Sequence, residues 1–182
     1  MLGHEIANNL KEEEVIDCME GARFNVMLKK KGVIDFQTIY GMVPDYFGER
    51  RFFVPEDHYR QKKGSLRGRE IEVKFSGFRK IDEYKQYDFE VLIYIDNAVE
   101  VEVEKDGEKK KMIEGECRVR NQMKLTTDWQ KKFKTPFKQK LKKFYDVYII
   151  KFEMIARVAE LYRDLMIPWN NKVKKVLELE GA

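Results

Sequence analysis

The sequence has few of the residues on which catalytic and metal sites usually depend. Its 182 residues include two cysteines, Cys18 and Cys117, and two histidines, His4 and His58. The cysteines are far apart and form no CxxC pair, so neither a disulfide framework nor a structural zinc site is expected. Glycine motifs with Walker or dinucleotide-binding spacing are absent as well. We therefore expect no metal, no cofactor and no catalytic residue, and we favour a binding protein over an enzyme.

Long apolar runs are also missing. No stretch approaches the roughly 18 apolar residues that a membrane-spanning helix needs. The N-terminal residues are polar and acidic, which is unlike a secretory signal. Together with the scarcity of cysteine, these features predict a protein of a reducing, cytoplasmic compartment.

Aromatic and charged residues are plentiful. Phe, Tyr and Trp make up 13% of the chain, and their large rings are expected to fill a core. Charged residues make up 37%, but 36 Lys and Arg nearly balance 32 Asp and Glu, which leaves a net charge of +4. This composition predicts a single domain, 1–182, with a mixed-charge surface. Its enrichment in Lys and Glu is of the kind reported for thermophilic proteins.

The first half of the chain predicts a helix followed by short strands. Apolar residues recur at helical spacing over 1–22, and alternation over 23–30 predicts a strand. A second, shorter strand is expected at 33–40. A proline and two glycines predict a loop over 41–48, and the polar, basic segment 55–69 predicts a longer loop.

Apolar and charged residues alternate clearly in the second part of a sheet that is expected to span 23–127. Four strands of an antiparallel meander are predicted there, at 71–75, 89–95, 99–103 and 113–125. A three-residue loop, Lys105-Asp106-Gly107, would pair Val99 with Ile113 and place both apolar rows on one face. Gly107 would then take the left-handed position of the turn.

A long amphipathic helix is predicted for residues 135–167. Thr135 is a suitable N-cap, and Pro136 loses nothing at the first helical position. Aromatic and aliphatic residues follow at steps of three and four, and Pro168 is expected to end or kink the helix. A short helix is predicted for 169–180. The fold class is therefore α+β, an antiparallel meander packed on a long C-terminal helix, with an N-terminal helix.

The order of elements over about 69–165 resembles the helix-grip proteins of the START and Bet v1-like superfamily. The resemblance depends on the four alternating strands, the Lys105-Asp106-Gly107 hairpin and the Thr135-Pro136 helix start, whereas the initial helix departs from that family's pattern. It implies a space between sheet and helix that holds a lipid or another apolar small molecule, usually without catalysis. The residues that would line it are Phe75, Phe89, Val91, Ile93, Val101, Cys117, Val119, Met123, Phe144, Tyr148, Phe152 and Tyr162. The alternative is a filled core, because protein interiors pack near crystal density.

Two basic segments, 58–80 and 130–143, predict a different kind of partner. The candidate anion-binding residues are Arg60, Lys62, Lys63, Arg67, Arg69, Lys131, Lys132, Lys134, Lys138 and Lys142. With Tyr59, Trp129 and Phe133 available for stacking, these segments could bind nucleic acid or another anionic partner. The same cations could instead pair with acidic residues over 82–116. A third hypothesis is a scaffold or interaction protein that dimerises through 166–179.

Overall fold

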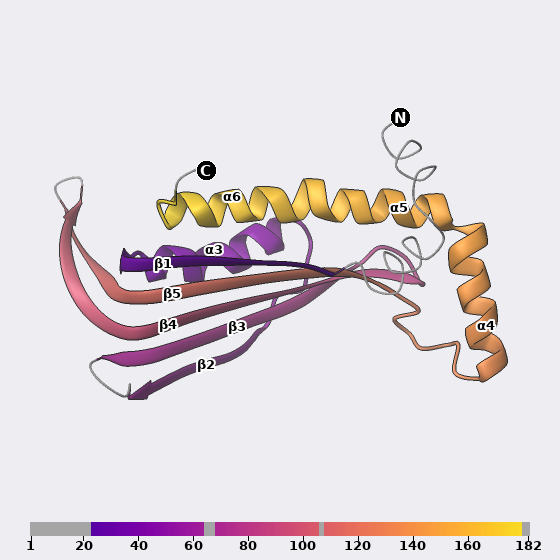
Figure 1. Ribbon diagram of the computed structural model, residues 1–182, viewed down its shortest axis with the longest axis horizontal. Coiled ribbons are helices and arrows are strands. Elements are labelled where there is room, and N and C mark those ends of the chain that lie inside the picture. Colours follow the sequence, from indigo (N-terminus) through magenta and orange to yellow (C-terminus); the bar gives the residue numbers. More distant parts are fainter. Residues whose placement is uncertain (1–22, 64–67, 106–107, 180–182) are drawn as a thin grey trace. The chain divides into compact units, whose positions relative to one another are not determined.

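The computed structural model describes residues 23–63, 68–105 and 108–179. The helix predicted for 1–22 therefore lies outside the described residues, as does the predicted hairpin turn, apart from Lys105, which belongs to a strand. The predicted α+β class with an antiparallel sheet is confirmed. Five strands form one sheet in the order β1-β5-β4-β3-β2 (Figure 1). The strands are β1 (Arg23–Ile34), β2 (Glu56–Lys63), β3 (Arg69–Lys80), β4 (Lys85–Lys105) and β5 (Glu108–Thr127).

The chain divides into two compact units that are interleaved in the sequence. Among the described residues, the helical unit comprises Phe24 with its preceding neighbour, Arg79–Asp88 and Met123–Pro168, and the sheet unit comprises those within Asn25–Phe78 and Phe89–Gln122 and those from Trp169 to Leu179. The helices are α3 (Phe36–Glu49), α4 (Pro136–Phe144), α5 (Lys151–Glu160) and α6 (Ile167–Val176), with π-helical turns η1 (Tyr145–Ile149) and η2 (Leu161–Met166).

Helix α3 replaces the strand predicted at 33–40 and the loop predicted at 41–48. Asp35 caps it, because its carboxylate accepts a hydrogen bond from the backbone N–H of Thr38 at 3.1 Å. Its buried side chains recur at helical spacing: Phe36, Ile39, Val43, Tyr46 and Phe47. The sequence prediction was wrong because it gave a proline and two glycines more weight than this spacing.

Strand β2 occupies most of the segment predicted as a basic loop at 55–69. It pairs antiparallel with β3, with Gln61 opposite Ile71 and Arg60 opposite Glu72. No periodic pattern marks this strand, because its residues are polar on both faces and lack an apolar period of two. Charged side chains suit an edge strand, since they discourage pairing with another chain.

Two apolar runs that the sequence predicts as separate strands, 89–95 and 99–103, belong to the single strand β4. Asn97 interrupts their alternation with a positive φ of 54°. The buried row of odd-numbered residues ends before it, and the next buried residue is Ala98. Val99 is consequently 45% exposed, whereas the sequence pattern placed it on the inner face.

The C-terminal helix begins where the sequence predicts, but it is not straight. Thr135 Oγ1 accepts a hydrogen bond from the backbone N–H of Lys138 at 3.3 Å, and Pro136 opens α4. After the π turn η1 the backbone leaves helical geometry at Ile150, with φ −107° and ψ 15°. Figure 1 shows α4 turned away from α5 at this point. Pro168 does not end the helix but lies within α6, directly after the wider π turn η2.

Aromatic side chains fill the core of the sheet unit between strand and helix. The ring of Phe47 on α3 stacks on that of Phe89 on β4, with centroids 3.8 Å apart and planes 1° from parallel. The indole of Trp169 on α6 packs 5.2 Å from the rings of both Tyr46 and Phe47. None of these four side chains is more than 3% exposed. Around Phe89, one of the residues predicted to line a ligand space, side chains therefore fill the core.

The helical unit has its own smaller core. Tyr87 is fully buried, and its hydroxyl donates to the carbonyl oxygen of Arg157 at 2.9 Å. The ammonium of Lys85, also buried, donates to Glu153 and lies 3.0 Å from Asp82. Burial opposes the charge of Lys85, but hydrogen bonds to Glu153 and Asp82 outweigh it and raise the pKa of the amine.

Candidate ligand pocket

A pocket of about 310 Å³ opens in the sheet unit beside the first turn of α3. It is lined by Phe36, Gln37, Tyr59, Gln61, Arg69, Ile71, Glu100, Lys111, Met112 and Ile113. Its volume lies near the lower limit of small-molecule sites, which span roughly 300 to 1,000 Å³. A second, more open hollow of about 700 Å³ lies in the same unit and involves Gly32, Asn97 and Gly115.

The inner wall of the pocket is apolar and well packed. Phe36, Ile71 and Met112 are each at most 8% exposed, and they come from α3, β3 and β5 respectively. The ring of Tyr59 on the edge strand lies 6.5 Å from that of Phe36, whereas 42% of the Tyr59 residue remains exposed. An aromatic ring is therefore available both at the base and at the rim of the pocket.

An ion pair holds the start of α3 against β5 and so fixes the position of Phe36. The ammonium of Lys110 donates a hydrogen bond to the Asp35 carboxylate, the same group that caps α3. Burial disfavours the charge on Asp35, but hydrogen bonds from Lys110 and Thr38 outweigh burial and hold the pKa of the carboxyl below its usual value. Asp35 therefore stays ionised and keeps the wall in place at neutral pH.

Polar groups converge at the mouth of the pocket. Arg69 donates one hydrogen bond to Glu100 and another to Gln61 Oε1 at 3.5 Å. The amide of Gln61 also donates to the hydroxyl of Tyr59 at 2.5 Å. Lys111 lines the same mouth. These groups come from four strands and can offer hydrogen bonds and positive charge to a molecule whose apolar part rests on the inner wall.

Sequence reasoning assigned most of these residues no role. No sequence pattern marks the pocket, because its lining residues are scattered over α3, β2, β3, β4 and β5. In addition, α3 was predicted as a strand and a loop, and β2 was predicted as a loop. Tyr59, predicted for stacking, is one exception, and the other is Arg69, which was predicted as an anion-binding residue. The structure places it in the pocket, where Glu100 compensates part of its charge.

The residues predicted to line a space beneath the long helix fall into two groups. The sheet residues Phe75, Phe89, Val91, Ile93, Cys117, Val119 and Met123 are buried, and Val101 is half-buried. The helix residues are instead between 45% and 62% exposed: Phe144, Tyr148, Phe152 and Tyr162. The prediction that these rings face the core is therefore wrong.

A second apolar stripe occupies the inner face of the helical segment. Its members within the helical unit are Val147, Met154, Leu161 and Leu165, which are all at most 8% exposed. The bend at Ile150 and the π turns change the rotation per residue. Residues at steps of three and four along this segment therefore do not all lie on one face, as the sequence prediction assumed.

The predicted anion-binding residues lie in different units. Arg60, Lys62, Lys63 and Arg69 are exposed in the sheet unit, Lys131, Lys132, Lys134, Lys138 and Lys142 belong to the helical unit, and Arg67 lies outside the described residues. Arg60 and Lys62 of β2 stand opposite Glu72 and Glu70 of β3, so each of these cations lies beside an acidic residue. This strand is not a continuous positive face.

The proposed stacking residues of the helical unit have intramolecular contacts. The ammonium of Lys80 lies 4.3 Å above the Trp129 ring, whose N–H donates to the carbonyl of Asp82 at 3.0 Å. Phe133 packs edge-on against Tyr84, with centroids 6.1 Å apart. Both rings contribute to folding of this unit.

The segment 166–179, predicted as a dimerisation surface, buries several of its apolar side chains within the chain itself. Met166, Trp169, Val173 and Leu177 are at most 1% exposed in a single chain. These side chains therefore form part of the core and not an exposed face.

Metal and thiol chemistry find no support in residues 23–63, 68–105 and 108–179. No group of three or more His, Cys, Asp or Glu side chains in these residues could hold a metal ion. Cys117 is 1% exposed, and burial raises the pKa of its thiol to about 12, so it is protonated at neutral pH and a poor nucleophile. Among the helices of the same residues, none has the length and apolar character needed to cross a membrane.

Comparisons with known proteins give no family for this chain. No family model matches it, and no curated protein matches it. A solved structure that it resembles is the di-domain ARO/CYC protein StfQ from the steffimycin biosynthetic pathway, at 11% identity and a TM-score of 0.19. The match covers 85% of this chain and 56% of that chain, so this chain spans little more than half of the longer protein.

Proposed function

We propose that this protein binds a small amphipathic molecule, non-catalytically, in the pocket beside the start of α3. The observation that carries the proposal is the meeting of an apolar wall and a polar mouth in one concavity of about 310 Å³. Small-molecule sites commonly combine mostly apolar walls with a few convergent polar groups. The binding of an apolar molecule was expected from the sequence, but the proposed position differs from the space beneath the long helix.

The lining residues define the chemistry of the ligand. Phe36, Ile71 and Met112 would contact a ring or a short alkyl group and remove it from water. Lys111 and Arg69 would face an anionic or hydrogen-bond-accepting group at the mouth. A carboxylate or sulfonate attached to an aromatic ring fits this arrangement, whereas a long lipid chain exceeds the volume.

A matched pair of substitutions on the edge strand tests the position of the site. Gln61→Trp adds a large ring at the mouth, whereas Arg60→Trp adds the same ring one residue away, on the opposite face of β2. Both residues are exposed, so both variants are expected to fold. The probe is anilinonaphthalene sulfonate, an aromatic sulfonate, whose binding is followed by fluorescence.

We expect Gln61→Trp to weaken binding of the probe at least about tenfold, which corresponds to roughly 1.4 kcal/mol. Arg60→Trp is expected to bind like the unmodified protein. Native mass spectrometry of the purified protein, performed in parallel, should detect a co-purified molecule of small mass that Gln61→Trp lacks. Equal binding of the probe by both variants, with no co-purified molecule, would contradict the proposal.

A further inference from the structure

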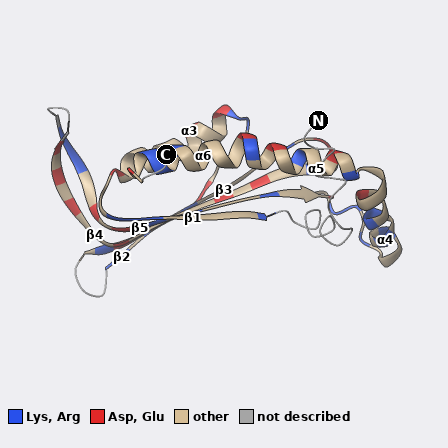
Figure 2. Ribbon diagram, turned by 45° about the horizontal axis from the view of Figure 1, so that its top comes forward, with Lys and Arg blue, Asp and Glu red and all other residues tan. Residues whose placement is uncertain are grey.

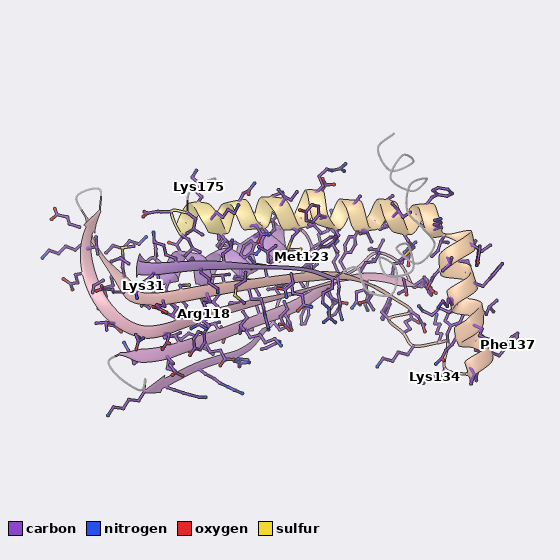
Figure 3. The ribbon with its side chains drawn as sticks, viewed as in Figure 1. Lys31, Arg118, Met123, Lys134, Phe137 and Lys175 are labelled. Atoms are coloured by element: carbon purple, nitrogen blue, oxygen red, sulfur yellow. The ribbon has the colours of Figure 1, made fainter. Side chains whose placement is uncertain are left out.

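Helix α4 exposes an apolar face that nothing in the described part of the chain covers. None of its side chains is buried, and Phe137, Leu141 and Phe144 recur along one side with exposures of 76%, 49% and 52%. Figure 3 shows Phe137 on the outer side of α4. The face continues past the end of α4, because the rings of Phe144 and Tyr148 pack with centroids 5.1 Å apart. Tyr148 itself is 62% exposed.

Lysines flank this apolar face, and α4 itself contains no acidic residue. The seventeen residues 129–145 contain seven lysines and neither Asp nor Glu. At about 100° per residue, Lys138 and Lys140 fall on opposite flanks of the apolar face. Both are exposed and form no ion pair with a described residue, whereas Lys142 lies 2.9 Å from Asp146. Figure 2 shows basic residues along α4.

We propose that α4 docks on the surface of an anionic phospholipid bilayer. Helices that lie in a membrane interface combine an aromatic and aliphatic face with a lysine-rich polar face. Phe137, Leu141 and Phe144 would enter the boundary between head groups and acyl chains. Lys138 and Lys140 would extend along both flanks to the lipid phosphates, because long lysine side chains reach past an apolar surface. The helix would lie on the bilayer without crossing it.

The charge and shape of the face argue against other occupants. A second copy of the chain would bring lysines against lysines. Nucleic acid would engage the lysines but would leave Phe137, Leu141 and Phe144 without a role, since such interfaces are highly polar. An acidic protein would need a groove that accepts a convex helix with cations on both flanks, whereas a bilayer adapts its shape to these side chains.

Sedimentation with vesicles tests the proposal on the full chain. One set of vesicles contains phosphatidylcholine alone and the other contains an added fraction of phosphatidylglycerol. We expect binding to the anionic vesicles that weakens as salt is raised, and little binding to the neutral ones. Replacing Lys138 or Lys140 by Gln should weaken binding about fivefold each, from roughly 1 kcal/mol per cation near the surface. Phe137→Ser should weaken it about tenfold or more.

Two matched variants control for unspecific effects. Lys175→Gln removes an exposed lysine from α6, and Phe53→Ser removes an exposed ring from the sheet unit. Neither should change vesicle binding more than about twofold, a shift of roughly 0.4 kcal/mol. Equal sensitivity of these controls and the α4 variants would overturn the proposal. So would equal binding to neutral and anionic vesicles, or duplex DNA displacing the vesicles at the same salt concentration.

A spin label provides a readout that does not depend on affinity. The label is attached at Leu141→Cys in a Cys18→Ser background, because the remaining Cys117 is buried. On anionic vesicles the label should become accessible to oxygen dissolved in the lipid and protected from a water-soluble relaxation agent. A label that stays in water on these vesicles would overturn the proposal, as would a dimer that forms through Phe137. Since the ligand pocket lies in the other unit, either proposal can fail without the other.

Discussion

Truncating Phe89 to alanine tests whether the space between sheet and helices is filled. The Phe89 ring is 3% exposed, stacks on Phe47 and meets Phe52 edge-on at 5.5 Å. Removing a ring from such a site leaves a cavity as well as losing burial, and typically costs about 3 to 5 kcal/mol. If a void for a ligand already adjoined the ring, the cost would be limited to lost burial, about 1.5 to 3 kcal/mol.

The stacked geometry adds a second, independent expectation. In a double-mutant cycle, Phe47→Ala and Phe89→Ala should show a coupling energy, because each ring is the other's main partner. Aromatic pairs contribute about 0.5 to 1.5 kcal/mol beyond area burial. The cavity shared by the double variant adds to this coupling. Independent effects of the two substitutions would contradict the packing that the structure shows.

Urea unfolding provides the measurement. In a Trp129→Phe background, fluorescence reports on Trp169, which is buried next to Phe47 in the sheet unit. The control is Phe137→Ala, because that ring is 76% exposed and its loss should change the free energy of unfolding by at most about 0.5 kcal/mol. A loss below about 3 kcal/mol for Phe89→Ala, the range expected beside an existing void, would refute the reasoning.

Further substitutions probe particular positions in the sheet unit. Burial disfavours the charge of Glu90, but Lys74 at 2.8 Å and Arg120 at 3.1 Å outweigh burial and lower its pKa. The stabilisation that ionised Glu90 provides is therefore fully present above the ordinary glutamate pKa of about 4.3. It is lost as the pH falls through the lower pKa of the folded state. Glu90→Gln should thus cost up to about 1 kcal/mol at pH 7 and almost nothing near pH 2, in urea unfolding at both pH values. Gly77→Ala should destabilise the protein by about 1 to 3 kcal/mol or prevent folding, because the added Cβ would lie 2.1 Å from a backbone oxygen. Gly41→Ala is the matched control: it has open space around it in α3 and should raise the melting temperature. Asn121→Ala should cost about 1 to 3 kcal/mol, since it removes the 2.7 Å hydrogen bond of the buried Asn170, and a double variant that also replaces Asn170 should recover part of the loss.

The sequence predicts the sheet well wherever one face is apolar and the other charged. The alternation that ends in Leu125 defines β5, and the Thr135-Pro136 pair defines the start of α4, because capping chemistry acts locally. Strand β2 could not be found in this way. Its pairing depends on β3, and no apolar period shows in its own residues.

The phase of a strand depends on single residues that a periodic pattern cannot detect. The alternation before and after Asn97 has the same parity in the sequence, so nothing in it signals a change of face. The positive φ at Asn97 moves the buried positions of β4 from odd-numbered residues to Ala98 and turns Val99 outward. The candidate pocket depends on such long-range details, since Phe36, Ile71 and Met112 meet only through tertiary packing.

The C-terminal helical segment contains two apolar stripes, and spacing alone cannot decide which one faces the core. Val147, Met154 and Leu161 fill the inner face, whereas Phe144 and Tyr148 belong to the aromatic stripe left outside. A fully buried large side chain gains about 1.5 to 3 kcal/mol over an exposed one, so several exposed rings on one helix forgo a considerable stabilisation. Contiguous apolar surfaces with a polar rim generally mark sites of interaction. The aromatic stripe predicted for the core is therefore the part of the helix with the strongest physical reason to bind a partner.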